Sequence, residues 1–200
     1  MLEGDLINMD LMEIIRTRRS IRKYQDRQIT SEELEKVITA GLYAPNAGGR
    51  QGSIIVGVNN AKLTEQIGKL NIAKFDRSAL LGAYVSDEQP SIIDDPTIKS
   101  GFYGAPSVCI VFGPEDFLYS VPDAFCCAEN MVLEATSLGL SSCIIARGEE
   151  TFDNPEGKKF LEQWEIPESY TARCFVLLGY LDGKEPSTKP LHEGRKKIIA

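Results

Sequence analysis

Apolar residues recur along this chain with two different periods, one typical of helices and one typical of buried strands. Helical spacing predicts an amphipathic helix over residues 30–42 and a broadly apolar helix over 122–138, and a polar helix is expected near residues 155–164. Four short runs of β-branched and other apolar residues predict strands, at residues 54–58, 106–112, 141–146 and 172–180. Strands interleaved with helices predict an α+β fold, an α/β sandwich built around one sheet.

Two capping boxes mark where helices begin. Thr30 followed by Glu33 places a hydroxyl and a carboxylate where each can bond a free backbone N–H of the other residue. Asp10 and Glu13 predict the same arrangement for a short first helix. Gly139 predicts the end of the helix over 122–138, because glycine readily adopts the left-handed conformation that closes a helix.

Two stretches lack a regular pattern within what the length predicts to be a single domain, residues 1–200. Residues 72–104 mix aromatic residues, glycine and proline, which is more typical of a lid or substrate-binding segment than of simple disorder. The tail, residues 181–200, is charged and contains proline without a core pattern. Such a tail either stays free or wraps around a partner.

The charge balance excludes some classes of partner. With 29 acidic and 22 basic residues the net charge is -7, which disfavours nucleic acid and anionic membranes. No apolar run approaches the roughly 20 residues of a membrane helix, and the first residues lack a signal-peptide pattern. We expect a cytoplasmic protein with neither a nucleic-acid nor a membrane partner.

The cysteine and histidine content predicts neither a metal site nor a disulfide framework. All five cysteines lie among apolar residues, where they are typical of reduced, buried side chains. The one histidine, His192, lies in the charged tail. This removes most hydrolase triads and histidine-ligated metal sites.

The densest group of cations follows the first helix, in the run Arg18-Arg19-Ser20-Ile21-Arg22. In an extended chain side chains alternate, so Arg18, Ser20 and Arg22 would share one face. Two guanidinium groups beside a hydroxyl suit a phosphate monoester. Cations at a helix end also complement the helix dipole, and the residues alone leave both interpretations open.

A polar, glycine-rich loop, residues 44–52, leads into the strand at 54–58. It lacks Gly-Lys-Ser/Thr and precedes a strand instead of a helix, so it does not predict a P-loop. The strand at 106–112 is followed by no GxGxxG pattern, so a Rossmann dinucleotide site is not predicted either. The loop is either an ordinary turn or the lining of a polar ligand such as a flavin ring edge.

Four sequence blocks in this order resemble motifs of the nitroreductase family of FMN-dependent oxidoreductases, at residues 18–24, 44–51, 137–143 and 179–182. The resemblance implies a mostly antiparallel central sheet flanked by helices. It also implies an obligate homodimer with FMN between the subunits, and a C-terminal tail that wraps the partner subunit. NADH or NADPH would donate hydride to flavin N5, and a nitroaromatic, quinone or similar acceptor would then be reduced by a ping-pong mechanism.

The resemblance also assigns roles around the flavin. Arg18 and Ser20 would hold the FMN phosphate, with Lys189 matching a second phosphate ligand, and Arg22 would tune the ring from its N1/O2 edge. Asn71 would meet the pyrimidine edge, while Arg19 is interpreted as structural although it belongs to the motif. The implied FMN-binding set is Arg18, Arg19, Ser20, Arg22, Pro45, Asn46, Ala47, Gly49, Gln51, Asn71, Ile145, Ala146, Arg147, Lys189 and Arg195.

The sequence departs from the family pattern at three places. Gly49 stands where the loop usually has asparagine, and Gly52-Ser53 replaces a common Pro-Trp. Leu191 stands where an arginine often binds phosphate, a role that Arg195 could take over. These departures leave two alternatives: a flavin enzyme of the same fold with another chemistry, such as reductive dehalogenation or flavin destruction, or a flavin-binding protein without catalysis.

Overall fold

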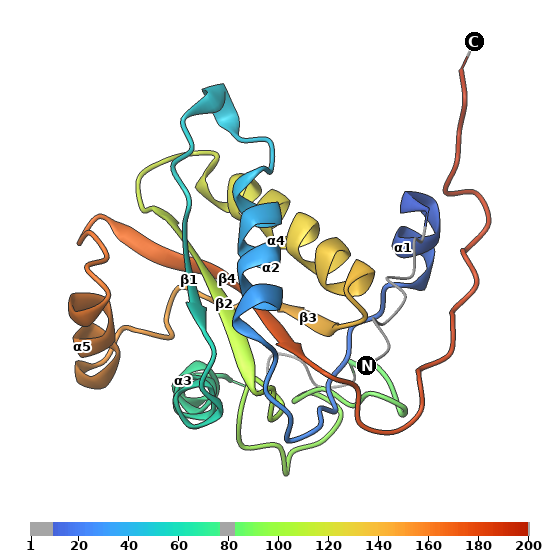
Figure 1. The fold of residues 1–200 in the computed structure, drawn as a ribbon, viewed down its shortest axis with the longest axis horizontal. Helices are drawn as coiled ribbons and strands as arrows, with labels where there is room; N and C mark the ends of the chain where they lie inside the picture. The colour runs from blue at the N-terminus through green and yellow to red at the C-terminus, as the bar shows by residue number, and fades with distance from the viewer. Residues whose placement is uncertain (1–9, 77–82, 200) are drawn as a thin grey trace, which may run out of the picture.

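The computed structural model describes residues 10–76 and 83–199 (Figure 1). Its sheet contains β1 (Ile54–Val58), β2 (Ser107–Pro114), β3 (Ser141–Ile145) and β4 (Tyr170–Gly179) in the order β1-β2-β4-β3. Every neighbouring pair is antiparallel. The two inner strands, β2 and β4, are almost entirely buried, as their continuous apolar runs predict. The predicted α+β fold and its four strands are therefore confirmed.

Helices cover both faces of this sheet. The helices are α1 (Leu11–Thr17), α2 (Ser31–Leu42), α3 (Ala61–Ala73), α4 (Ser120–Ser137) and α5 (Pro155–Gln163), with a short 3₁₀ turn, η1 (Ala47–Gly49). The pair α2 and α4 packs on one face, while α3 and α5 contribute to the apolar cluster on the other. Among the described residues, no helix is long and apolar enough to cross a bilayer.

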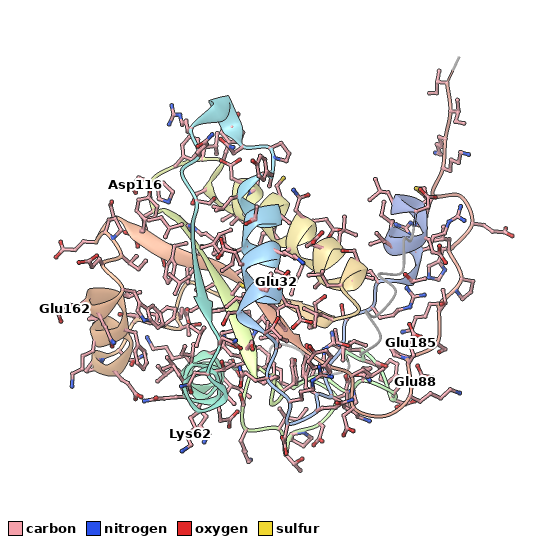
Figure 2. The ribbon with its side chains drawn as sticks, viewed as in Figure 1. Glu32, Lys62, Glu88, Asp116, Glu162 and Glu185 are labelled. Atoms are coloured by element: carbon pink, nitrogen blue, oxygen red, sulfur yellow. The ribbon has the colours of Figure 1, made fainter. Side chains whose placement is uncertain are left out.

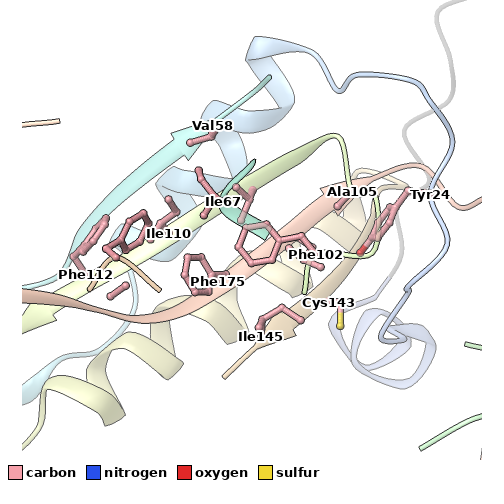
Figure 3. Packing of buried hydrophobic residues seen from close by; sticks show 14 of the residues in the cluster. Tyr24, Val58, Ile67, Phe102, Ala105, Ile110, Phe112, Cys143, Ile145 and Phe175 are labelled. Carbon is pink, nitrogen blue, oxygen red and sulfur yellow. The ribbon is translucent and has the colours of Figure 1, made fainter. Parts of the chain in front are cut away.

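Helices α2 and α4 approach closely because glycine lies at their contact. A Cβ added to Gly41 would lie 2.7 Å from the sulfur of Met131, which is fully buried. The opposite face holds an aromatic cluster in which Phe102 and Phe175 lie 4.9 Å apart between ring centroids (Figure 3). The sheet thus separates two cores and forms a rigid support for the loops at its ends.

Of the two predicted capping boxes, one is present in the structure and one is not. The Thr30 hydroxyl accepts the Glu33 N–H at 3.1 Å, and the Glu33 carboxylate accepts the Thr30 N–H at 2.7 Å, so that box is confirmed. The box at Asp10 is wrong, because the Asp10 side chain makes no capping bond. Its backbone carbonyl instead accepts the Glu13 N–H at 2.9 Å, which closes the first turn of the exposed helix α1.

The two irregular segments differ in how they pack. Residues 83–104 contain neither helix nor strand, yet Ser91, Ile92 and Phe102 are buried. Residues 77–82 of the predicted lid lie outside the described residues, so the lid remains a prediction. The tail runs past α1 in an extended conformation and is mostly exposed, as Figure 1 shows at its red end.

Candidate functional site

The cationic run after α1 is held against the edge of the sheet. Ser20 pairs with Ser142 of β3 as an isolated parallel bridge, and the Ile21 N–H donates to the Ser142 carbonyl at 2.9 Å. The Ile21 side chain, only 4% exposed, packs into the core. Arg18, Ser20 and Arg22 line a shared cavity on the other side of this extended segment. The predicted alternation therefore holds at Ile21 but not at Arg19, which lines the same cavity as Arg18, Ser20 and Arg22.

This cavity measures about 900 Å³ and is built from three parts of the chain. Its walls come from α1 and the cationic run, from residues 85–89, and from tail residues 186–191. Arg16, Arg18, Arg19, Arg22 and Lys189 contribute five cationic groups, against one carboxylate among the described lining residues, that of Glu88. A cavity with this excess of positive charge favours an anionic ligand.

The carboxylate of Glu88 is engaged by the tail instead of by an arginine. It accepts the Ser187 N–H at 2.9 Å and the Ser187 hydroxyl at 3.1 Å, and Figure 2 shows Glu88 beside the tail. These two hydrogen bonds hold the pKa of Glu88 below its usual value. Glu88 therefore joins the cavity walls and makes no ion pair with the cations among the described residues.

The cations around the cavity use their hydrogen-bonding capacity to different extents. Arg19 donates at 2.7 Å to the carbonyls of Arg16 and Arg18, and also to the Thr188 hydroxyl. It thereby ties α1 to the tail, which favours its interpretation as structural. Lys189 donates to the Val85 carbonyl at 3.3 Å. The guanidinium of the half-buried Arg18 has neither a hydrogen bond nor an ion pair to any described residue, so it can serve a ligand.

Arg22 is held through both its backbone and its side chain. Its backbone N–H donates to Oε1 of Gln89 at 2.6 Å, and its Nη1 donates to the Gln89 carbonyl at 3.2 Å. The centre of its guanidinium lies 5.8 Å from the ring centroid of Tyr103. Burial raises the pKa of Tyr103, while the positive charges of Arg22 and Arg147 act in the opposite direction.

The loop that follows β3 carries another group of predicted residues. Ala146 and Arg147 line a hollow of about 280 Å³ together with Asn71 of α3. The Asn71 amide donates at 2.6 Å to the Arg147 carbonyl and at 2.9 Å to the Thr151 hydroxyl. Ile145, at the end of β3, packs into the core with 7% exposure. The structure therefore brings Asn71, Ala146 and Arg147 together. The N–H donors of the Asn71 amide are bonded to groups of the same chain.

The glycine-rich loop is ordered by its own side chains. Oδ1 of Asn46 accepts the Gln51 N–H at 2.8 Å, and the Ala47 N–H donates to Asp123 at 3.0 Å. Gly49 has a φ of 63° and Gln51 a φ of 50°, both in the left-handed region. Gly49 suits this conformation, in which an asparagine would be mildly strained and a β-branched residue strongly so. Pro45 is exposed beside these residues.

The loop and the cationic run lie at opposite ends of α4. Asp123, which holds the loop, is in the first turn of α4, whereas Ser137 at its other end lines a hollow together with Arg18. The rise of an α-helix places these two positions about 21 Å apart. Figure 1 likewise shows η1 far from α1. Within one chain, the structure does not bring Pro45, Asn46, Ala47, Gly49 or Gln51 to the cavity.

Two residues lie differently from what the sequence predicts, one outside the cavity and one in its wall. Arg195 is exposed in the tail and is not among the residues that line the cavity, whereas Leu191 is. Gln89, which holds Arg22 and is 4% exposed, was not predicted as part of the site. Its contact with Arg22 spans 67 positions of the chain, and no local pattern signals it. Among the described residues, no group of acidic, cysteine or histidine side chains could hold a metal ion.

Known proteins resemble this chain over almost its full length. The sequence model described as the nitroreductase family matches residues 15–180. A protein of Methanothermobacter thermautotrophicus, provisionally named NADH dehydrogenase/NAD(P)H nitroreductase, is 29% identical and aligns over 96% of this chain and 87% of its own. A similarly named protein of Archaeoglobus fulgidus is 28% identical, over 86% of this chain and 85% of its own.

Solved structures agree with these sequence matches. A nitroreductase of Bacteroides fragilis with bound FMN has a TM-score of 0.80 and 29% identity, covering 96% of this chain and all (100%) of its own. One from Desulfitobacterium hafniense, also with bound FMN, has a TM-score of 0.73 at 22% identity, covering 96% of this chain and 100% of its own. The second likeness concerns the fold alone. Together they confirm the fold that the four sequence blocks predict.

Proposed function

Because this chain belongs to the nitroreductase family, we propose that it is an FMN-dependent oxidoreductase that uses NADH or NADPH. In this proposal a nitroaromatic, a quinone or a similar acceptor is reduced in the second half of a ping-pong sequence. The observation that carries the proposal is the cavity beside Arg18, Ser20 and Arg22, where cations gather and the one described lining carboxylate is turned to the tail. The FMN-bound nitroreductase of B. fragilis, which is similar over 96% of this chain, supports the same cofactor.

The residues of the cavity fit the parts of FMN. Arg18 and the Ser20 hydroxyl offer donors for a phosphate, and Lys189 retains further N–H donors besides the one that meets Val85. Met12 and Ile15 of α1 supply apolar wall. A dianionic phosphate on a ligand with an apolar part therefore matches the cavity in charge and in polarity.

The chemistry belongs to the cofactor, and the protein binds, orients and polarises it. Bound FMN supplies the two-electron step, since its N5 accepts hydride from a nicotinamide and can pass the electrons on. Arg22 carries a permanent positive charge, which favours negative charge developing near it. Arg18 and Ser20 hold the phosphate end, so that the ring is fixed relative to Arg22. In this mechanism no side chain is required to act as an acid or base.

A second copy of the chain completes the proposed site. The loop residues and the cationic run lie about 21 Å apart along α4, so one FMN contacts both only if they come from two subunits. Large apolar side chains border the loop and are exposed, Leu42 by 56%, Tyr43 by 84% and Leu118 by 81%. Such a patch favours a protein partner. The tail beyond Pro190, with exposed Ile198 and Ile199, would wrap the partner subunit.

The decisive experiment is the visible spectrum of the purified protein, recorded before and after anaerobic addition of NADH and then NADPH. We expect a flavin spectrum that bleaches with at least one of the two and returns when a nitroaromatic or a quinone is added. A colourless protein that also fails to bind added FMN would refute the proposal. FMN that binds and is not bleached would identify a flavin-binding protein without catalysis.

Two further measurements test the finer parts of the proposal. Light scattering of the FMN-loaded protein should give the mass of a dimer, and a monomer that retains FMN would contradict the shared site. A screen of acceptors against the reduced protein tests the alternative chemistries. Faster reoxidation by a halogenated aromatic than by any nitroaromatic or quinone would favour reductive dehalogenation, and loss of the flavin itself would favour flavin destruction.

A further inference from the structure

Residues 85–94 form a compact turn around a single carboxylate. Asp94 accepts backbone N–H groups from Val85 at 2.7 Å, from Ser91 at 2.8 Å and from Ser86 at 3.3 Å. Side-chain oxygens of aspartate stabilise turns in this way, because they replace backbone acceptors that a helix or strand would provide. The segment has no regular secondary structure, and Asp94 therefore gives it a defined conformation beside the cavity.

The turn presents Gln89 to Arg22 with both of its acceptors. The Gln89 N–H donates to the Ser86 hydroxyl at 3.1 Å, which fixes the backbone of Gln89 within the turn. Its side-chain Oε1 accepts the Arg22 N–H at 2.6 Å, and its backbone carbonyl accepts Nη1 of the Arg22 guanidinium at 3.2 Å. A backbone N–H can only donate, so the Gln89 amide must turn its oxygen toward Arg22.

We infer that Gln89 is a positioning residue that holds the Arg22 guanidinium in the orientation it needs beside the flavin. This inference rests on the proposed function. Among the described residues, only Nη1 of the Arg22 side chain has a hydrogen-bond partner, so Nε and Nη2 remain for a ligand. Tyr103 lies on another side of the same guanidinium, at 5.8 Å. A long, flexible side chain held in this way loses less entropy when a ligand binds.

Burial makes the contact sensitive to the chemistry of residue 89. Gln89 is 4% exposed, so water cannot readily replace its oxygen if that oxygen is removed. Loss of Oε1 would leave the Arg22 N–H without its acceptor and would loosen the turn against Arg22. The Arg22 guanidinium would then adopt several orientations, and its stabilisation of reduced FMN would weaken.

The test compares Gln89→Met with Gln163→Met in the FMN-loaded protein. Methionine keeps the unbranched shape of glutamine without its acceptor, and Gln163 is the exposed last residue of α5, away from the cavity. The readout is the affinity for reduced FMN relative to oxidised FMN, obtained from the reduction potential of the bound cofactor. We expect Gln89→Met to lower this ratio about fivefold, as for one ordinary hydrogen bond, and Gln163→Met to leave it unchanged.

A double variant separates positioning from general damage to the fold. If Gln89 acts through Arg22, Gln89→Met should have no further effect on the ratio in an Arg22→Met protein. A ratio unchanged by Gln89→Met in the wild-type background would overturn the inference. So would an equal decrease in both backgrounds, because it would mean that residue 89 acts independently of Arg22.

Hydrogen exchange of the Arg22 amide in the FMN-free protein distinguishes this inference from the proposed function. We expect exchange about fivefold faster in Gln89→Met than in wild type, in line with the loss of one hydrogen bond. If wild-type protein binds no FMN, the proposed function fails, and with it the role of Gln89 toward a flavin. Exchange that stays equally slow in Gln89→Met would show that the Gln89 contact itself does not hold Arg22.

Discussion

Two arginine sites at opposite ends of β4 differ in how fully the protein satisfies them. Arg173, near the start of the strand, is 8% exposed and donates to Ser120 Oγ at 2.9 Å and Glu149 at 2.6 Å. Its Nη2 also donates to the carbonyls of Pro114 and Glu115, at 2.6 and 3.0 Å. Beyond the other end of the strand, the Arg18 guanidinium has no hydrogen-bond or ion-pair partner among the described residues.

The difference separates a cation that supports the fold from cations that are proposed to bind a ligand. Arg173 joins β4, the end of β2 and the start of α4, and four of its five N–H donors bond acceptors supplied by the chain. The cations beside Arg18 repel one another, and Glu88, which could pair with them, bonds Ser187 instead. A protein gains no stability from such a cluster, which is expected where function requires an unsatisfied site.

Replacing Arg173 should produce the largest loss of stability. Arg173→Met removes the donor from two carbonyls and from Ser120 in a buried region, so we expect the free energy of unfolding to fall by about 3 kcal/mol. Glu149 is 61% exposed and can be solvated, which keeps the loss below that for a fully buried charge. Urea unfolding of the FMN-free protein measures the change. Arg195→Met, in the exposed tail, is the matched control and should stay within about 0.5 kcal/mol.

Arg18→Ala should show the opposite pattern. Because no described residue bonds the Arg18 guanidinium, the free energy of unfolding should change by less than about 0.5 kcal/mol. The dissociation constant for FMN should rise about 100-fold, since two charge-assisted hydrogen bonds to phosphate would be lost. Titration of the FMN-free protein with FMN measures the affinity. A marked loss of stability with unchanged FMN affinity would place Arg18 with Arg173 as a structural cation.

Arg22→Met divides the cluster further. Arg22 is proposed to tune the ring, so the variant should retain FMN but favour its reduced form about tenfold less, which is a decrease of about 30 mV for a two-electron couple. Spectroelectrochemical titration of the bound flavin measures this potential. Loss of FMN from Arg22→Met, with retention by Arg18→Ala, would reverse the roles of the two arginines.

Local features of the fold could be predicted because their causes lie within a few residues. The Thr30 capping box and the broadly apolar α4 follow from neighbouring positions, and both are present. The predicted start of α4 at Pro122 is late by two residues, because proline is tolerated in the first turn, which begins at Ser120. The Asp10 side chain makes no capping bond because the Asp10 backbone carbonyl accepts the Glu13 N–H in its place. The sequence pattern does not reveal which of the two oxygens accepts it.

Residues of the candidate site could be predicted only where they belong to a recognisable sequence motif. The run around Ser20 has a recognisable order of residues, and the structure places it on the cavity. Gln89 lies in a segment without periodicity, and its role depends on a turn built by Asp94 and on a contact with Arg22 distant in sequence. Separation of the glycine-rich loop from the cavity follows from the direction of α4, which is a property of the folded chain.

The smallest of the expected effects is on stability and concerns Asp94. Backbone N–H groups satisfy its carboxylate, much as acceptors of the chain satisfy the Arg173 guanidinium. Burial acts to raise the pKa of Asp94, but the N–H groups of Ser91 and Val85 outweigh it and hold the pKa below its usual value. A lowered pKa in the folded state contributes stability above the unfolded value of about 3.9, and this is lost as pH falls through the folded pKa.

We therefore expect wild-type protein to exceed Asp94→Asn in free energy of unfolding at pH 7, and this excess to shrink as pH falls below about 4. Urea unfolding at pH 7, 5, 4 and 3 measures the difference between the two proteins, in which the titration of other carboxylates cancels. Asp116→Asn, which replaces an exposed carboxylate on the opposite side of the molecule from Glu88 (Figure 2), is the matched control for the substitution itself. An excess that stays constant with pH would mean that the ionised form of Asp94 is not what orders the turn that holds Gln89.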